Sequence, residues 1–217
     1  MNTPRHDIYA FIHKGLRAFM AHTLVRAGRL DVHDEAEVAE VSEELRAVLT
    51  ICRHHLDNEN TYVHTAIAAR QPGACDLIAH EHVEHEAAIA ELEGMVDALP
   101  GDAAALRRLY LRLSLFVAEN FEHMQREETR MNAALWATHS DEEIMVIEHR
   151  IIASHEPQEM QLALRWMLPH LSPEERSVML VGMRAHAPAE AFAGVLGLIR
   201  PLLGGRDWRK LSQALGL

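Results

Sequence analysis

The sequence predicts an all-α protein: an up-down-up-down four-helix bundle followed by a smaller C-terminal helical extension. Hydrophobic residues make up 48% of the chain but aromatic residues only 5%, and long runs rich in Ala, Leu, Glu and Arg favour helix over sheet. Apolar residues recur every three or four positions in four long segments, as on one face of a helix. The linkers between these segments are short, which is typical of antiparallel neighbours in a bundle.

Four long helices account for the first 138 residues. Thr3 and Asp102 are the expected N-caps of the first and last of them, because a short oxygen-bearing side chain accepts hydrogen bonds from free N–H groups there. Gly and Pro residues separate the segments and end each helix. The predicted helices span residues 4–26, 34–70, 74–99 and 102–138.

Shorter helices follow, and we place a soft boundary at 139–156, with a bundle domain at 1–138 and an extension at 139–217. Ser172-Pro173-Glu174-Glu175 is a strong helix start, with Ser as N-cap and Pro at the first helical position. The apolar residues of the extension either pack on the chain's own bundle, which we favour, or form a homodimer. The predicted helices span 141–154, 157–168, 172–188, 189–200 and a short stretch around Trp208.

Charge and composition exclude several classes of protein. The formal net charge of −11 disfavours nucleic-acid binding. The chain has no apolar run long enough for a membrane span, and its first residues lack the apolar stretch of a secretory signal. Cys52 and Cys75 form no CxxC pair, and the simplest interpretation is a cytoplasmic protein with reduced thiols.

The chain has 16 histidines, and several interrupt the apolar stripes of the four long helices. Counted from the helix ends, these histidines and two glutamates fall in one layer, roughly 12–18 Å below one end of the expected bundle. Surface histidines would have no reason to converge in this way. The candidate metal ligands are His13, His55, Glu59, His82, His85, His123 and Glu127.

The chemistry of these residue types points to a transition metal. Burying an unpaired carboxylate or imidazole costs on the order of several kcal/mol, which a bound cation offsets. Histidine nitrogen combined with carboxylate oxygen suits Fe, Mn or Zn better than Ca or Mg. Five histidines and two carboxylates exceed the four ligands of a tetrahedral zinc ion, and they suit two octahedral ions that carboxylates bridge.

Other polar residues near the stripes have less defined roles. His64 and His80 are either supporting groups or surface residues, and Glu81 is a reserve carboxylate ligand. Tyr62 is the only acid/base candidate on a stripe, and a buried aromatic role is the simpler interpretation of it. The segment 80–85 fits neither zinc-protease pattern, HExxH or HxxEH.

The chain resembles the hemerythrin and HHE cation-binding family over residues 5–138. The resembling motifs are FIHKGLR around His13, HHLDNEN with His55 and Glu59, EHVEHE, and HMQREE around His123. The resemblance implies two non-haem iron ions, bridged by carboxylates or oxygen, with Zn or Mn as substitutes.

The chain departs from the family pattern in two places. Animal hemerythrins have HxxxH where this chain has HxxH, which leaves one or both of His82 and His85 as ligands, with His85 preferred if only one ligates. Glu128 matches the animal spacing on the fourth helix, whereas the apolar stripe favours Glu127.

Three functions are compatible with such a site. The resemblance favours binding of O₂ or NO for sensing, delivery or storage. The alternatives are an enzyme-like role, in peroxide or NO detoxification or in iron–sulfur cluster repair, and iron storage. Whether the protein is an enzyme stays open.

Overall fold

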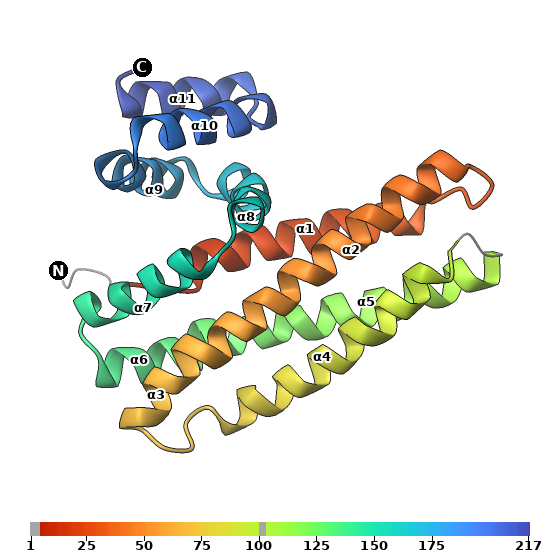
Figure 1. Cartoon of the computed structure of the whole chain (residues 1–217), viewed down its shortest axis with the longest axis horizontal. Coiled ribbons are helices and arrows are strands. Elements are labelled where there is room, and N and C mark those ends of the chain that lie inside the picture. The colour runs from red at the N-terminus through yellow and green to blue at the C-terminus, as the bar shows by residue number, and fades with distance from the viewer. Residues whose placement is uncertain (1–4, 100–102) are drawn as a thin grey trace. The chain divides into compact units, whose positions relative to one another are not determined.

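The computed structural model describes residues 5–99 and 103–217, and within these ranges the chain is helical with no β-strand (Figure 1). The predicted all-α class is confirmed. None of the helices in the described ranges combines the length and the apolar composition that crossing a membrane requires.

Contacts divide the chain into two compact units. The first comprises Met1–Ala10 and Phe19–Ser154, and the second comprises Phe11–Ala18 and His155–Leu217. Helix α1 (Ala10–Gly28) therefore contributes residues to both units, and α7 (Asp141–Ser154) belongs to the first.

Helix α1 begins later than the sequence predicts. The expected start at residue 4 is wrong, because residues 5–9 are not helical and the helix begins at Ala10. The carboxylate of Asp7 accepts the backbone N–H groups of Tyr9 and Ala10, both at 3.0 Å, and so satisfies donors at the start of the helix. The expected N-cap Thr3 lies outside the described residues.

The second predicted helix is continuous from residue 35 to 70 but changes its hydrogen bonding midway. It consists of α2 (Glu35–Asn58), the π-helical segment η1 (Glu59–His64) and α3 (Thr65–Arg70). Asp34 caps it by accepting from Ala36 N and Glu37 N. A π-helical segment is rare and is frequently found at functional sites.

The fourth predicted helix has the same construction. It consists of α5 (Ala103–Arg126), the π-helical segment η2 (Glu127–Met131) and α6 (Asn132–Thr138). Its expected N-cap, Asp102, lies outside the described residues. The third predicted helix is α4 (Asp76–Asp97).

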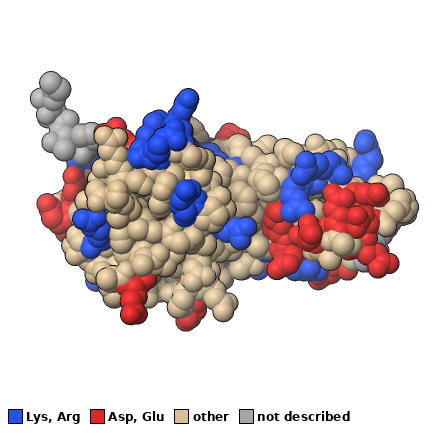
Figure 2. Space-filling view, turned by 90° about the horizontal axis from the view of Figure 1, so that it is seen from above, with Lys and Arg blue, Asp and Glu red and all other residues tan. Residues whose placement is uncertain are grey.

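The long helices of the first unit lie lengthwise against one another, α2 beside α4 and α4 beside α5 (Figure 1). Ion pairs reinforce the end where α1 leads into α2, and Figure 2 shows acidic and basic side chains side by side there. Arg26 on α1 contacts Glu44 at 2.8 Å and Glu40 at 3.2 Å on α2.

The predicted stripes are buried as expected on α4 and α5. On the second helix the prediction fails after Glu59. Tyr62, which the sequence places on the apolar stripe, is only half-buried, as is Ala66 one turn later, and Val63 and Ile67 are buried instead. The π-helical segment causes this shift, because it adds a residue to the turn and moves the buried face by one position.

An apolar cluster closes the first unit next to the π-helical segments. Tyr9, Ile67, Leu135 and Ile144 are among its buried members, so the N-terminal segment, α3, α6 and α7 all contribute.

The second unit is built from short helices around its own core. Ser172 and Glu175 form the predicted capping box at the start of α9. Phe11 and Ile12 of α1 pack against the core, whose buried members include Leu168 and Leu180. The helices are α8 (Pro157–His170), α9 (Pro173–His186), α10 (Ala189–Ile199), the 3₁₀ segment η3 (Arg200–Leu202) and α11 (Gly205–Leu215).

Candidate metal centre

Two buried glutamates occupy equivalent positions in the two π-helical segments. Glu59 is the first residue of η1 and Glu127 is the first residue of η2. Their exposed fractions are 3% and 0%. Two carboxylates buried this deeply are costly unless a positive charge or a proton accompanies them.

Two histidines complete a group of four donors around these carboxylates. Nε2 of His82 lies 3.1 Å from Nε2 of His123, 3.5 Å from Glu59 Oε2 and 3.4 Å from Glu127 Oε1. Nε2 of His123 lies 3.1 Å from the same Glu127 oxygen. Ligands about 2.1 Å from an ion are roughly 3.0 Å apart at octahedral angles and about 3.4 Å apart at tetrahedral angles. The observed separations fit donor atoms that could hold one metal ion.

Each of the two histidine rings makes a hydrogen bond through Nδ1, on the side away from this group. These hydrogen bonds determine which tautomer presents Nε2 to the group. Nδ1 of His82 is 2.8 Å from the Asn60 side-chain oxygen, and Nδ1 of His123 is 2.8 Å from Glu81 Oε2. Both partners are acceptors, so each Nδ1–H donates and a neutral ring keeps the lone pair on Nε2. Two lone pairs only 3.1 Å apart repel each other unless a proton or a metal cation lies between them. Such outer hydrogen bonds are typical of metal-binding histidines.

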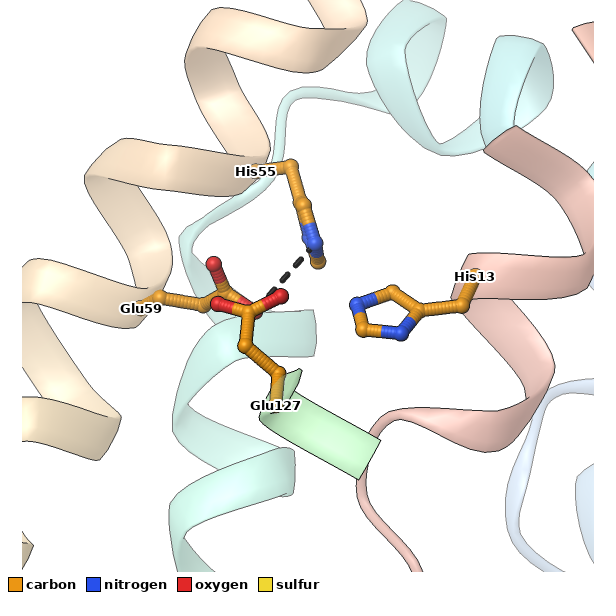
Figure 3. A group of neighbouring side chains, drawn as sticks. All are labelled: His13, His55, Glu59 and Glu127. Atoms are coloured by element: carbon orange, nitrogen blue, oxygen red, sulfur yellow. Dashed lines mark ion pairs between the residues drawn. The ribbon is translucent and has the colours of Figure 1, made fainter. Parts of the chain in front are cut away.

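A second group of donors shares both glutamates with the first. His13, His55, Glu59 and Glu127 each offer an atom within 4.8 Å of the others (Figure 3). His13 is fully buried, and Nε2 of His55 lies 3.2 Å from Glu59 Oε1. The same 4.8 Å limit holds for Glu59, His82, His123 and Glu127. The two groups are therefore adjacent, with the two carboxylates common to both.

The pKa shifts of the site show that it favours a bound positive charge, either protons or a metal ion. Burial, and then the neighbouring Glu127, raise the pKa of Glu59 well above its usual value. Burial alone would lower the pKa of His123, but its contacts with Glu127 and Glu81 outweigh that effect and raise it. Without a metal, the protein favours protons on these groups.

His85 is the one predicted ligand that lies in neither group. Its ring is buried and stands edge-on to that of His123, with 4.6 Å between centroids. Burial, and then His123, lower its pKa to about 3. The preference for His85 over His82 as a single ligand on α4 is thus the reverse of the observed grouping, in which His82 takes part.

The structure separates the other open candidates. Glu81 holds the His123 ring and is itself bound by Arg126 at 2.7 Å, so it supports the first group from outside. Glu128 is half-buried and belongs to neither group. Tyr62 is half-buried against the apolar cluster. The tyrosine that lies near the carboxylates is instead Tyr9. Burial, and then Glu59 and Glu127, raise the pKa of Tyr9 well above its usual value of 10.

No family model, curated protein or solved structure matches this chain significantly. The centre is accordingly described by its own geometry: buried histidines and glutamates in two groups that could each hold a metal ion.

Proposed function

We propose that this protein binds two transition-metal ions side by side, with Glu59 and Glu127 bridging them. The observation that carries the proposal is the sharing of these two carboxylates by two sets of histidines. His13 and His55 would complete one metal position, and His82 and His123 the other. Two divalent ions would more than offset the charge of both buried carboxylates and would remove the repulsion between the facing imidazole nitrogens.

Iron is the metal we propose, with Zn or Mn as substitutes. Mixed imidazole and carboxylate ligation suits all three metals. It differs from the all-oxygen ligation that Ca and Mg prefer. The resemblance of the motifs around His13, His55, Glu59 and His123 to the hemerythrin and HHE cation-binding family supports iron. The same resemblance supports a four-helix bundle made by α1, the α2–α3 helix, α4 and the α5–α6 helix.

The function we infer is binding of a small diatomic molecule, O₂ or NO, at this centre. Each group supplies four donor residues, fewer than the six ligands of an octahedral ion, so room for an exogenous ligand remains. The neighbouring apolar cluster, with Ile67 and Leu135 fully buried, would limit access of bulk water to it. The ions would supply the electrons and coordination positions, and the protein would position the donors and exclude water.

Metal analysis tests the first part of this proposal. Protein purified from iron-supplied cells should contain close to two equivalents of iron, and Glu59→Gln should lose most of it. Glu84→Gln, at a solvent-exposed position on α4, is the matched control and should retain it. Wild-type protein with neither iron nor another transition metal would exclude the proposal.

Rapid mixing tests the second part. The reduced, iron-loaded protein should bind O₂ or NO with a spectral change that reverses when the gas is removed. Irreversible oxidation without a reversible phase would instead assign the site to turnover of an oxidant.

A further inference from the structure

His64 is a buried histidine that belongs to neither donor group yet lies directly beside one of them. Only 7% of it is exposed, and its ring stacks on that of His82 with 4.9 Å between centroids and 20° between planes. Its Nε2 is buried and has no hydrogen-bond partner among residues 5–99 and 103–217. A buried polar atom of this kind calls for an explanation, such as a ligand that occupies the site at other times.

The π-helical segment η1 is what turns His64 inward. His64 follows Glu59 by five positions. In an α-helix five residues rotate by about 500°, which would place His64 about 140° away from Glu59. In a π-helix, hydrogen bonds join residues five apart, so that such residues lie roughly one turn apart on the same side.

The second π-helical segment provides an internal comparison. Asn132 follows Glu127 by five positions and is likewise fully buried. Its amide nitrogen donates to Asp7 at 2.8 Å and to the carbonyl of Glu128 at 3.1 Å. Both segments therefore turn a polar side chain toward the interior. The amide nitrogen of Asn132 fastens the N-terminal segment. Its Oδ1, like Nε2 of His64, makes no hydrogen bond within the described chain.

We propose that His64 is the residue that binds the exogenous ligand of the metal centre, by a hydrogen bond from its imidazole to a small anion or diatomic molecule held beside His82. This inference rests on the proposed metal binding. The ring lies one stacking distance from His82 rather than among the converging donor atoms, which suits contact with a ligand of the metal rather than with the metal itself.

Cobalt(II) and azide provide a test with a readout other than activity. The full-length protein is loaded with cobalt(II), and azide is titrated while the visible bands of the metal are followed. His64→Phe keeps a stacking ring but removes both nitrogens, and should weaken azide binding about tenfold, the effect of losing one hydrogen bond to a charged partner. His64→Gln, which keeps an N–H donor, should recover most of the affinity.

Three controls decide between outcomes. His80→Phe, at an exposed position on α4, should bind azide as the wild type does. Cobalt affinity should be the same in His64→Phe as in the wild type, and the metal-free variant should be at least as stable, because it loses a polar atom that has no partner. Unchanged azide affinity, loss of cobalt or a clear drop in stability in His64→Phe would each overturn the role of His64. Failure of the wild type to bind cobalt would instead overturn the metal centre itself.

Discussion

His123 and Glu81 are joined by a hydrogen bond of 2.8 Å between Nδ1 and Oε2, and Arg126 contacts the other oxygen of Glu81 at 2.7 Å. The His123 ring is thereby held from behind, with Nε2 directed toward His82 and Glu127. The arginine holds Glu81 in place, so the carboxylate both orients the imidazole and increases its basicity as a ligand.

Removal of Glu81 should therefore weaken metal binding although Glu81 is in neither donor group. We expect Glu81→Ala to lower metal affinity by about 10–100-fold, as is typical when the outer partner of a metal-binding histidine is lost. Competition with a chromophoric chelator measures the change. Glu84→Ala, on the same helix but exposed, should have wild-type affinity, and equal affinities for the two variants would contradict the role of Glu81.

Metal binding should release protons and weaken on acidification. Burial and Glu127 raise the pKa of Glu59 well above its usual value. Burial lowers the pKa of His123, but its glutamate neighbours outweigh that effect and raise it above 6.5. A raised pKa means that the metal-free protein retains protons that a metal must displace, so affinity increases with pH and falls as the pH drops through these raised values. Calorimetric titration in two buffers of different ionisation enthalpy at neutral pH counts the released protons. Affinity that stays constant or rises on acidification would be incompatible with this set of ligands.

The contact between His6 and Glu148 on α7 should make the folding stability depend on pH, independently of metal binding. Nε2 of His6 lies 3.0 Å from Glu148 Oε2, and this hydrogen bond raises the pKa of His6 above 6.5 against the opposing effect of burial. A raised folded-state pKa contributes stability that is fully present below the unfolded value of about 6.5 and is lost as the pH rises through the folded value.

Replacement of Glu148 should remove that contribution. Glu148→Gln should lower the pKa of His6 measured by NMR. The variant should also unfold at a lower temperature than the wild type at pH 5, with the difference shrinking as the pH increases above 7. A difference that grows with pH would have the wrong sign for this pair.

The sequence predicted the helices, and its proposed ligands include all six residues of the two donor groups, because both follow the α-helical period. Glu127 and His123 were found because α5 is regular up to Arg126. His64 could not be placed, because its inward orientation depends on the π-helical segment η1, for which the apolar pattern of one chain gives no reliable signal. The proximity of Tyr9 to the two carboxylates arises from tertiary packing, which the pattern of one helix does not contain.

Spacing alone does not distinguish His82 from His85, and which of them ligates stays a prediction. Both lie on the buried face of α4, and one helical turn separates them. Only the positions of Asn60 and His123 on the neighbouring helices bring His82 into the donor group. Contacts between helices thus determine which of the two histidines lies in the donor group, and the periodicity of a single helix carries no information about those contacts.

Gly15 on α1 should be intolerant of any side chain because α8, which belongs to the same unit, packs directly on it. A Cβ atom at Gly15 would lie 2.9 Å from Cα and 3.1 Å from N of Met167 on α8. Both are backbone atoms, which cannot move aside as a flexible side chain would. Gly15→Ala should consequently lower the unfolding free energy by about 1–3 kcal/mol, the usual cost of overpacking, even though alanine favours helix formation.

Gly182, inside α9, is the matched control. Apart from the nearby backbone of α9 itself, no atom of residues 5–99 and 103–217 lies within 4 Å of a Cβ placed there. Gly182→Ala should therefore stabilise the protein by up to about 1 kcal/mol through helix propensity alone. Chemical denaturation of both variants measures the two effects, and they should have opposite signs. If Gly15→Ala were as stabilising as Gly182→Ala, residues 11–18 of α1 would not be packed against α8, and the composition of the second unit would have to be revised.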